Sequence, residues 1–240
     1  MNAQDNGASS QRRRGRVAVE AVALLAVPAA LAACASLRLE QGALLSVVAA
    51  IGALAVFFAS YESSRPALRQ IMPTVVLAAL AAAGRVLFAP FPDFKPVSAI
   101  CIIAGAVFGR RSGFMVGALA ALVSNLFFGQ GPWTPWQMYA WGLVGYFAGV
   151  LAARGALDRT PVLYAYGFCS AYLYGALLNA WYAIGFVHPF TWPAIAVSYL
   201  AALPFDTAHA VATVVFLAAL YEPWRRKLGR IKRKFALAGR

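Results

Sequence analysis

Polar side chains at a few positions interrupt stretches of the chain that are otherwise apolar, and these groups could do chemistry. They are Arg85, Asn125, Gln137, Asn179, Asp206 and His209. Asp206 and His209 are three residues apart, so they share one face of a helix. A charged side chain in hydrocarbon is costly unless it is paired or faces a cavity. The set therefore indicates either a solute-binding cavity or a buried network, such as an Arg85–Asp206 ion pair, that only fixes helix packing.

Enzyme motifs are not found around these groups. The sequence has no GxxxxGK[ST] loop for ATP hydrolysis, no HExxH motif and no Cys/His set for a metal. Ser124 and His209 could pair in an intramembrane serine protease, but Leu122-Val123-Ser124-Asn125 lacks the glycine-flanked turn of a nucleophile. We therefore expect neither an enzyme nor a cofactor.

The composition places these polar groups inside a membrane protein. Hydrophobic residues make up 62% of the chain and charged residues 12%, which is too little polar surface to coat a soluble domain. The apolar runs repeatedly approach the roughly 20 residues that span a bilayer. We expect an all-α integral membrane protein with eight transmembrane helices, at 17–36, 43–60, 71–89, 96–109, 112–128, 134–153, 162–181 and 194–221. The run at 96–109 is short enough to be a re-entrant half-helix.

The distribution of basic residues supports eight crossings. With eight spans, 18 of the 21 basic residues fall on one face, and the positive-inside rule makes that face cytoplasmic, together with both termini. These residues are Arg12, Arg13, Arg14, Arg16, Arg65, Arg69, Arg110, Arg111, Arg154, Arg159, Arg225, Arg226, Lys227, Arg230, Lys232, Arg233, Lys234 and Arg240. Arg38 and Lys95 fall on the other face, and Arg85 lies inside a span. The predicted organisation is a basic tail at 1–16, two additional helices at 17–62, a six-helix core at 71–221 and a basic tail at 222–240.

Two N- and C-terminal features have alternative interpretations. The net charge of +13 is accounted for by topology, so we expect no nucleic-acid partner, although the tail from Trp224 to Arg240 could also contact anionic lipid headgroups or an acidic partner. Leu31-Ala32-Ala33-Cys34 could be a lipoprotein processing site, or part of an ordinary first span.

Cys34, Cys101 and Cys169 lie in apolar runs, and we expect small buried side chains rather than a disulfide or a metal site.

Aromatic side chains gather in the loops of the outer face. These loops are 90–95, 128–134 and 182–193, and the candidate binding residues within them or at the adjoining span ends are Phe94, Lys95, Gln130, Trp133, Trp136 and Trp181. An interfacial aromatic belt would explain part of this enrichment. The glycines and prolines of FFGQGPWTPWQ at 127–137 favour instead a stiff loop that covers a solute pocket.

Small residues recur at spacings of three and four residues. Glycines at 105 and 109, 113 and 117, and 142, 145 and 149 would allow helix backbones to approach closely. Ala78, Ala79, Ala82 and Ala83 give a similar face, which could pack internally or receive the helix of a partner.

Three segments resemble the substrate-binding S component of energy-coupling factor (ECF) vitamin transporters. They are PxFKPVSAIxIIAGxxFG from Pro92 to Gly109, GFMVGALAALVSNLFFGQGPWTPWQMYAWGLVGYFAG from Gly113 to Gly149, and LPFDTAHA from Leu203 to Ala210. The resemblance covers the six spans from about 71 to 221, and the first two spans lie outside it.

The resemblance implies a membrane-embedded binding protein that captures a vitamin or related micronutrient from outside and works with a T component and two ATPase subunits. It implies that the solute lies under the loops at 90–95, 128–134 and 182–193, and that an Ala-xxx-Ala face at 78 and 82, or at 79 and 83, meets the T component. A ring-bearing vitamin would suit the mixed aromatic and polar groups, with cobalamin or a corrinoid as a first guess. A self-sufficient secondary permease is the alternative, although the sequence shows no inverted repeat or broken-helix pair.

Overall fold

The computed structural model describes residues 3–37, 42–63 and 68–234. The described chain is all-helical and has no strand. Its elements are α1 Ala3–Leu37, α2 Gly42–Glu62, α3 Leu68–Leu87, α4 Val97–Phe108, α5 Arg110–Phe128, α6 Trp133–Ala152, the short 3-10 helix η1 Ala156–Asp158, α7 Thr160–Phe186 and α8 Trp192–Lys234. Each predicted run overlaps one of the eight α-helices, which confirms the all-α class.

Four of these helices are long and apolar enough to cross a membrane. By length and composition they are Leu44–Glu62, α5, α7 and α8. Shorter apolar helices occur at Ala18–Ala30, Ile71–Leu87 and α4. At 1.5 Å per residue the 12 residues of α4 reach roughly 18 Å, which is less than the hydrocarbon thickness. The structure therefore shows a helical protein compatible with a membrane, in which α4 has less than a full span.

The core forms where α4, α5 and α6 meet without intervening side chains. Ten of the twelve residues of α4 are buried. A Cβ added at Gly113 would overlap the Gly145 carbonyl oxygen, and one added at Gly145 would overlap the backbone of Gly113. The expectation of close internal packing is therefore correct for this glycine pair, since any larger residue would force α5 and α6 apart.

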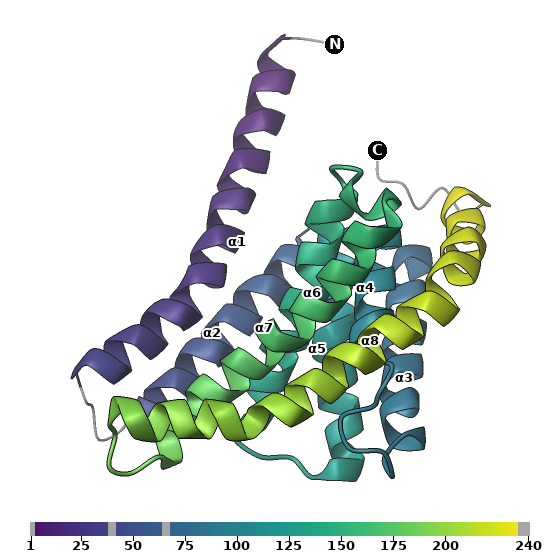
Figure 1. Ribbon diagram of the computed structural model, residues 1–240. Coiled ribbons are helices and arrows are strands. Elements are labelled where there is room, and N and C mark those ends of the chain that lie inside the picture. The colour runs from purple at the N-terminus through teal and green to yellow at the C-terminus, as the bar shows by residue number, and fades with distance from the viewer. Residues whose placement is uncertain (1–2, 38–41, 64–67, 235–240) are drawn as a thin grey trace.

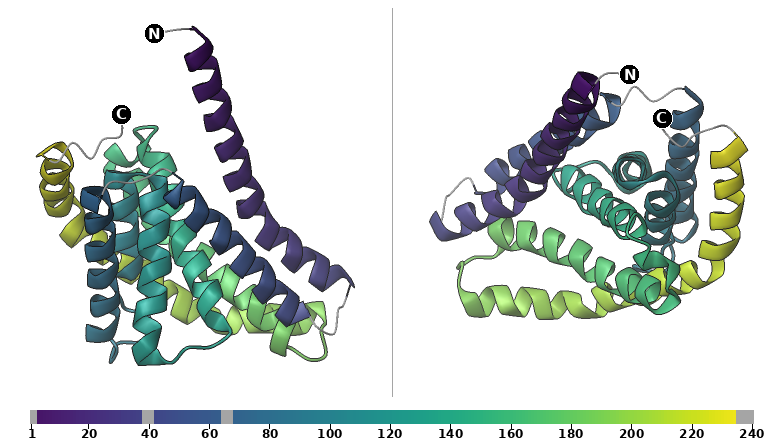
Figure 2. Two further views of the ribbon diagram at one scale, coloured as in Figure 1. Left: turned by 180° about the vertical axis from the view of Figure 1, so that it is seen from behind. Right: turned by 90° about the horizontal axis from the view of Figure 1, so that it is seen from above.

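The remaining core helices are arranged at a slant to this centre. Figure 1 shows α3 to α6 grouped together, while α7 and α8 run side by side away from them. The N-terminal end of α1 and the C-terminal end of α8 lie at one end of the molecule (Figures 1 and 2), and the segments at 88–96, 129–132 and 187–191 lie at the opposite end.

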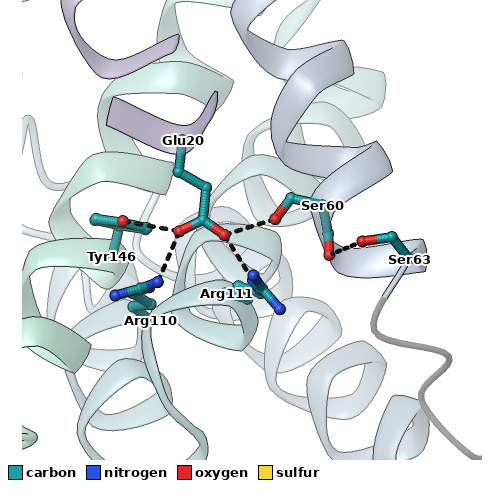
Figure 3. A network of polar contacts seen from close by, with 6 residues as sticks. All are labelled: Glu20, Ser60, Ser63, Arg110, Arg111 and Tyr146. Atoms are coloured by element: carbon teal, nitrogen blue, oxygen red, sulfur yellow. Dashed lines mark hydrogen bonds and ion pairs between the residues drawn. The ribbon is translucent and has the colours of Figure 1, made fainter. Parts of the chain in front are cut away.

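A buried carboxylate attaches the α1–α2 hairpin to the core. The Glu20 side chain of α1 is fully buried and receives hydrogen bonds from Ser60 of α2 at 2.6 Å and Tyr146 of α6 at 3.0 Å (Figure 3). It also forms ion pairs with Arg111 at 2.7 Å and with Arg110 at 3.1 Å. Two other helices, α2 and α6, and the start of α5 therefore converge on this single side chain of α1.

The two alanine pairs of α3 point in different directions. Ala78 and Ala82 are each 3% exposed, whereas Ala79 and Ala83 are exposed. The first pair packs internally, and the second lies on an outer surface. Cys101 is buried as expected, but Cys169 is exposed, so the expectation of a buried side chain is wrong there.

Some of the basic residues used for the topology, and Cys34, fall outside the part of the chain that the structure describes. Arg38, Arg65 and Arg240 lie outside the described residues, as do the side chains of Arg12, Arg13, Arg14, Arg16, Arg69 and Cys34.

Candidate functional site

A cavity of about 300 Å³ lies between α3, α6, α7, α8 and the segment that joins α3 to α4. Six of the predicted site residues line it: Arg85, Lys95, Gln137, Asn179, Asp206 and His209. Asp93, Val97, Trp141, Tyr174, Gly175, Leu178, Ala202 and Phe205 complete the lining. Helices distant in sequence therefore bring charged, amide and aromatic groups into one space.

Arg85 is held by groups on α5 and by two aromatic rings. Its Nη1 donates hydrogen bonds to Ser124 Oγ at 2.7 Å and to Asn125 Oδ1 at 2.6 Å. The guanidinium carbon lies 4.6 Å from the centroid of the Phe128 ring and 5.0 Å from that of Trp141, within cation–π range. These contacts fix the orientation of a cation at the cavity wall.

Asn125 supports this arrangement from behind. Its side chain is buried, and its Nδ2 donates to Gln137 Oε1 at 2.8 Å and to Thr134 Oγ1 at 3.0 Å. Asn125 does not line the cavity. It therefore orients Arg85 and Gln137 rather than facing a solute.

Aromatic rings and a buried histidine form the deep wall. The rings of Trp141 and Tyr174 stack with centroids 4.6 Å apart, and Tyr174 meets His209 edge-on at 5.1 Å. Ser98 Oγ accepts a hydrogen bond from Trp141 Nε1 at 3.1 Å and lies 2.7 Å from His209 Nε2. A stacked, hydrogen-bonded wall of this kind suits a planar ring.

The acidic side of the cavity depends on a glycine. Asn179 Nδ2 donates to Asp206 Oδ2 at 3.4 Å. A Cβ added at Gly175 would overlap the Asp206 carboxylate. Gly175 therefore makes room for the carboxylate between α7 and α8.

The connecting segment contributes two further charges. Asp93 adopts the left-handed conformation with φ of 53°, which aspartate tolerates better than most residues, and Phe94 packs against Phe88 and Phe216. Burial raises the pKa of the Asp93 carboxyl, against the opposing effect of Lys95 and Arg85. Burial lowers the pKa of the Lys95 ammonium, against the opposing effect of Asp93.

The cavity thus holds two basic and two acidic groups. Within the described ranges, no ion pair within 4.0 Å joins Arg85, Asp93, Lys95 or Asp206 to another residue. The alternative of an Arg85–Asp206 pair is therefore wrong in this structure, and Ser124 is bonded to Arg85 rather than to His209. Charges of both signs face the same space with room for a solute between them.

The prediction that the glycine–proline loop covers the solute is wrong in this structure. None of Phe94, Gln130, Trp133, Trp136 and Trp181 lines the cavity. Gln130 Nε2 donates to the Leu122 carbonyl oxygen at 2.9 Å, and Gln130 Oε1 accepts from Thr134 at 2.9 Å. These bonds hold the glycine–proline loop against the adjoining ends of α5 and α6, away from the cavity.

Two tryptophans expected near the solute are instead packed inside. Trp136 is fully buried and Trp181 is 8% exposed, and neither indole N–H has a hydrogen-bond acceptor among the described residues. Trp133 is 39% exposed and its ring lies over Gly131. The expectation that Trp136 belongs to an exposed loop is therefore wrong, because it lies in the first turn of α6.

Sequence reasoning missed eight of the lining residues, and three of these, Asp93, Trp141 and Tyr174, carry polar groups. Tyr174 is an aromatic residue within an apolar run, which gives no signal of its own, and Trp141 has the pattern of an interfacial residue. Asp93 lies in the connecting segment beside Lys95, and its charge was the available signal. No group of three His, Cys, Asp or Glu side chains that could hold a metal ion occurs in the described part of the chain.

Comparison with known proteins gives one match. Residues 65–227 match DUF6580, described as a family of unknown function. This range includes α3 to α7 and most of α8, and it excludes α1 and α2. No curated protein and no solved structure matches the chain.

Proposed function

The chain belongs to the DUF6580 family, and we propose that it is the membrane-embedded substrate-binding subunit of an ATP-driven importer of the ECF type. The observation that carries this proposal is the cavity of about 300 Å³, in which a fixed arginine, an aromatic wall and two carboxylates come together between apolar helices. Ionisable groups that face a cavity within a membrane protein are characteristic of solute pathways.

The cavity defines the class of solute. Its volume is at the lower end of small-molecule sites, which fits a vitamin-sized molecule with one or two rings. A corrinoid carries four pyrrole-derived rings in its macrocycle alone and is larger than this space, so the proposal favours a smaller solute. Groups of both charges at the wall favour a solute that has an acidic and a basic group, with its ring against Trp141 and Tyr174.

The proposed orientation places the cavity towards the outside and both termini in the cytoplasm, with all eight helices integrated in the membrane. Arg110 and Arg111 begin α5, Arg154 follows α6, and the basic segment from Arg225 ends α8, which fits the positive-inside rule. Retention of α1 is part of the proposal. Cleavage before Cys34 would remove Glu20 and leave Arg110 and Arg111 without their carboxylate.

The proposed partners are a T component and two ATPase subunits, since the sequence has no ATP-binding loop of its own. The exposed Ala79 and Ala83 give a surface on which a partner helix can approach closely.

The experiment is purification of the tagged protein from its own host in mild detergent, followed by reconstitution into vesicles. The proposal expects a T component and two ATPases in the purified complex. It also expects that the vesicles take up solute only when ATP is present on the side of the membrane that corresponds to the cytoplasm. Uptake by the chain alone, driven by an ion gradient without ATP, would identify a secondary permease instead.

A further inference from the structure

A second, apolar groove lies at the opposite end of the molecule from the solute cavity. Its volume is about 630 Å³, and it is lined only by α3 and by the C-terminal part of α8. Met72, Val76 and Leu80 of α3 form one wall, and Trp224, Leu228 and Ile231 of α8 form the other. The three α3 side chains are 46–55% exposed, so about half of the surface of each is left uncovered by the described residues.

The direction of α8 creates this groove. Pro223 lies within the helix, and proline removes a backbone hydrogen bond and bends a helix. Figure 1 shows the C-terminal end of α8 turning away from the oblique path of the rest of the helix. Trp224 and the residues that follow therefore face α3 across an open space.

Charge lies at the edge of this apolar space. Lys227 lines the groove and is exposed, and Arg230 follows on the adjacent part of the helix surface. In contrast, Arg225 and Arg226 are both bonded to Glu222. The groove thus combines long apolar walls with a cation that has no carboxylate beside it in the described residues.

We propose that this groove binds one anionic phospholipid, with an acyl chain of the lipid between α3 and α8 and its headgroup at Lys227. The walls consist of bulky side chains rather than the small residues that favour helix–helix contact in membranes. Ala79 and Ala83 lie on the same stripe of α3, because steps of three and four residues lead to them from Met72 and Val76, but they do not line the groove. Because lipid chains are as apolar as the groove, the selectivity comes from the charge of the headgroup.

Trp224 provides the measurement, because brominated acyl chains quench the fluorescence of an indole that they contact. The full-length protein is reconstituted in phosphatidylcholine that contains a minor fraction of brominated phosphatidylglycerol or, separately, of brominated phosphatidylcholine. Subtraction of the signal of Trp224→Phe isolates the contribution of this residue. We expect about fivefold more quenching of Trp224 by the anionic lipid, which is the enrichment from roughly 1 kcal/mol for one lysine near the headgroup.

Two charge variants complete the test. Lys227→Gln should abolish the preference for phosphatidylglycerol, whereas Arg233→Gln, which removes one charge from another face of the same segment, should retain it. Equal quenching of Trp224 by the two lipids would overturn the proposal, because it indicates ordinary bilayer contact. Absence of quenching by both lipids in a folded protein would also overturn it, because the groove would then be closed or filled by protein.

Discussion

Arg85 and Asp206 lie in the same cavity, yet each has its own partners. Arg85 donates to Ser124 and Asn125, and Asp206 accepts from Asn179. We predict that Arg85→Gln lowers solute affinity roughly 10- to 100-fold, the effect of losing a hydrogen bond to a charged group. The double variant Arg85→Gln, Asp206→Asn should recover neither affinity nor stability.

Solute affinity and thermal stability in detergent should be measured on both single variants and on the double variant. Arg159→Gln, an exposed arginine outside the cavity, is the matched control. A double variant that is more stable than either single variant would indicate a structural ion pair and would contradict the assignment.

For single residues, the sequence predicts which polar side chains of the helices line the cavity better than it predicts the role of loop residues. Arg85, Gln137 and Asp206 stand out because each interrupts an apolar run, where a polar side chain needs a partner or a cavity. The direction of Gln130 depends on a hydrogen bond with the Leu122 carbonyl, and no periodicity predicts that bond. The loop therefore could not be placed from its composition.

At the scale of the helices, the two alanine pairs of α3 distinguish internal packing from contact with a partner. We predict that Ala79→Leu with Ala83→Leu blocks ATP-dependent uptake and weakens association with the T component, while solute binding and stability are unchanged. The added bulk lies on an exposed face, where it hinders only an approaching helix. Co-purification and binding assays on the purified variant measure both effects.

The matched variant is Ala78→Leu with Ala82→Leu. Both of these alanines are buried, so the substitution overpacks the core and should destabilise the protein by about 1–3 kcal/mol per site. Normal association of the Ala79, Ala83 variant would assign that face to lipid rather than to a partner.

Glu20 determines the attachment of the α1–α2 hairpin. Glu20→Gln would leave Arg110 and Arg111 without a carboxylate, and we predict that it lowers the free energy of unfolding by about 3 kcal/mol. This is the lower end of the range for a broken buried ion pair, because both arginines are partly exposed. Glu62→Gln, at an exposed position of α2, should have no measurable effect. Thermal unfolding in detergent measures both, and equal stability of the two variants would show that the network does not anchor the hairpin.

The apolar runs predicted where helices occur, but they did not predict where each helix ends. The prediction ended the last helix at 221, whereas α8 continues to Lys234. Arginine and lysine are good helix formers, so the change from apolar to basic residues marks a change of environment rather than the end of the helix. The same reasoning applies to α1, which includes the basic residues Arg12 to Arg16.

For the whole molecule, the proposed orientation places Ser63 and Thr191 on opposite sides of the membrane. Both residues are exposed, so each can be replaced by cysteine in a cysteine-free background. We predict that a membrane-impermeant maleimide added to intact cells labels Thr191→Cys and not Ser63→Cys, and that permeabilisation makes both accessible. Labelling of both sites from outside would contradict the eight-span arrangement.

The central claim is that the cavity between α3, α6, α7 and α8 holds a small solute. The most direct measurement is mass spectrometry of the molecules released by denaturing the protein after purification from its own host. The account predicts one enriched compound with a ring, an acidic group and a basic group in the wild type and in Trp192→Phe, whose tryptophan is exposed. The same compound should be lost from Arg85→Gln and Asn179→Ala. An identical set of molecules in all four proteins, or a wild type that releases none, would contradict the account.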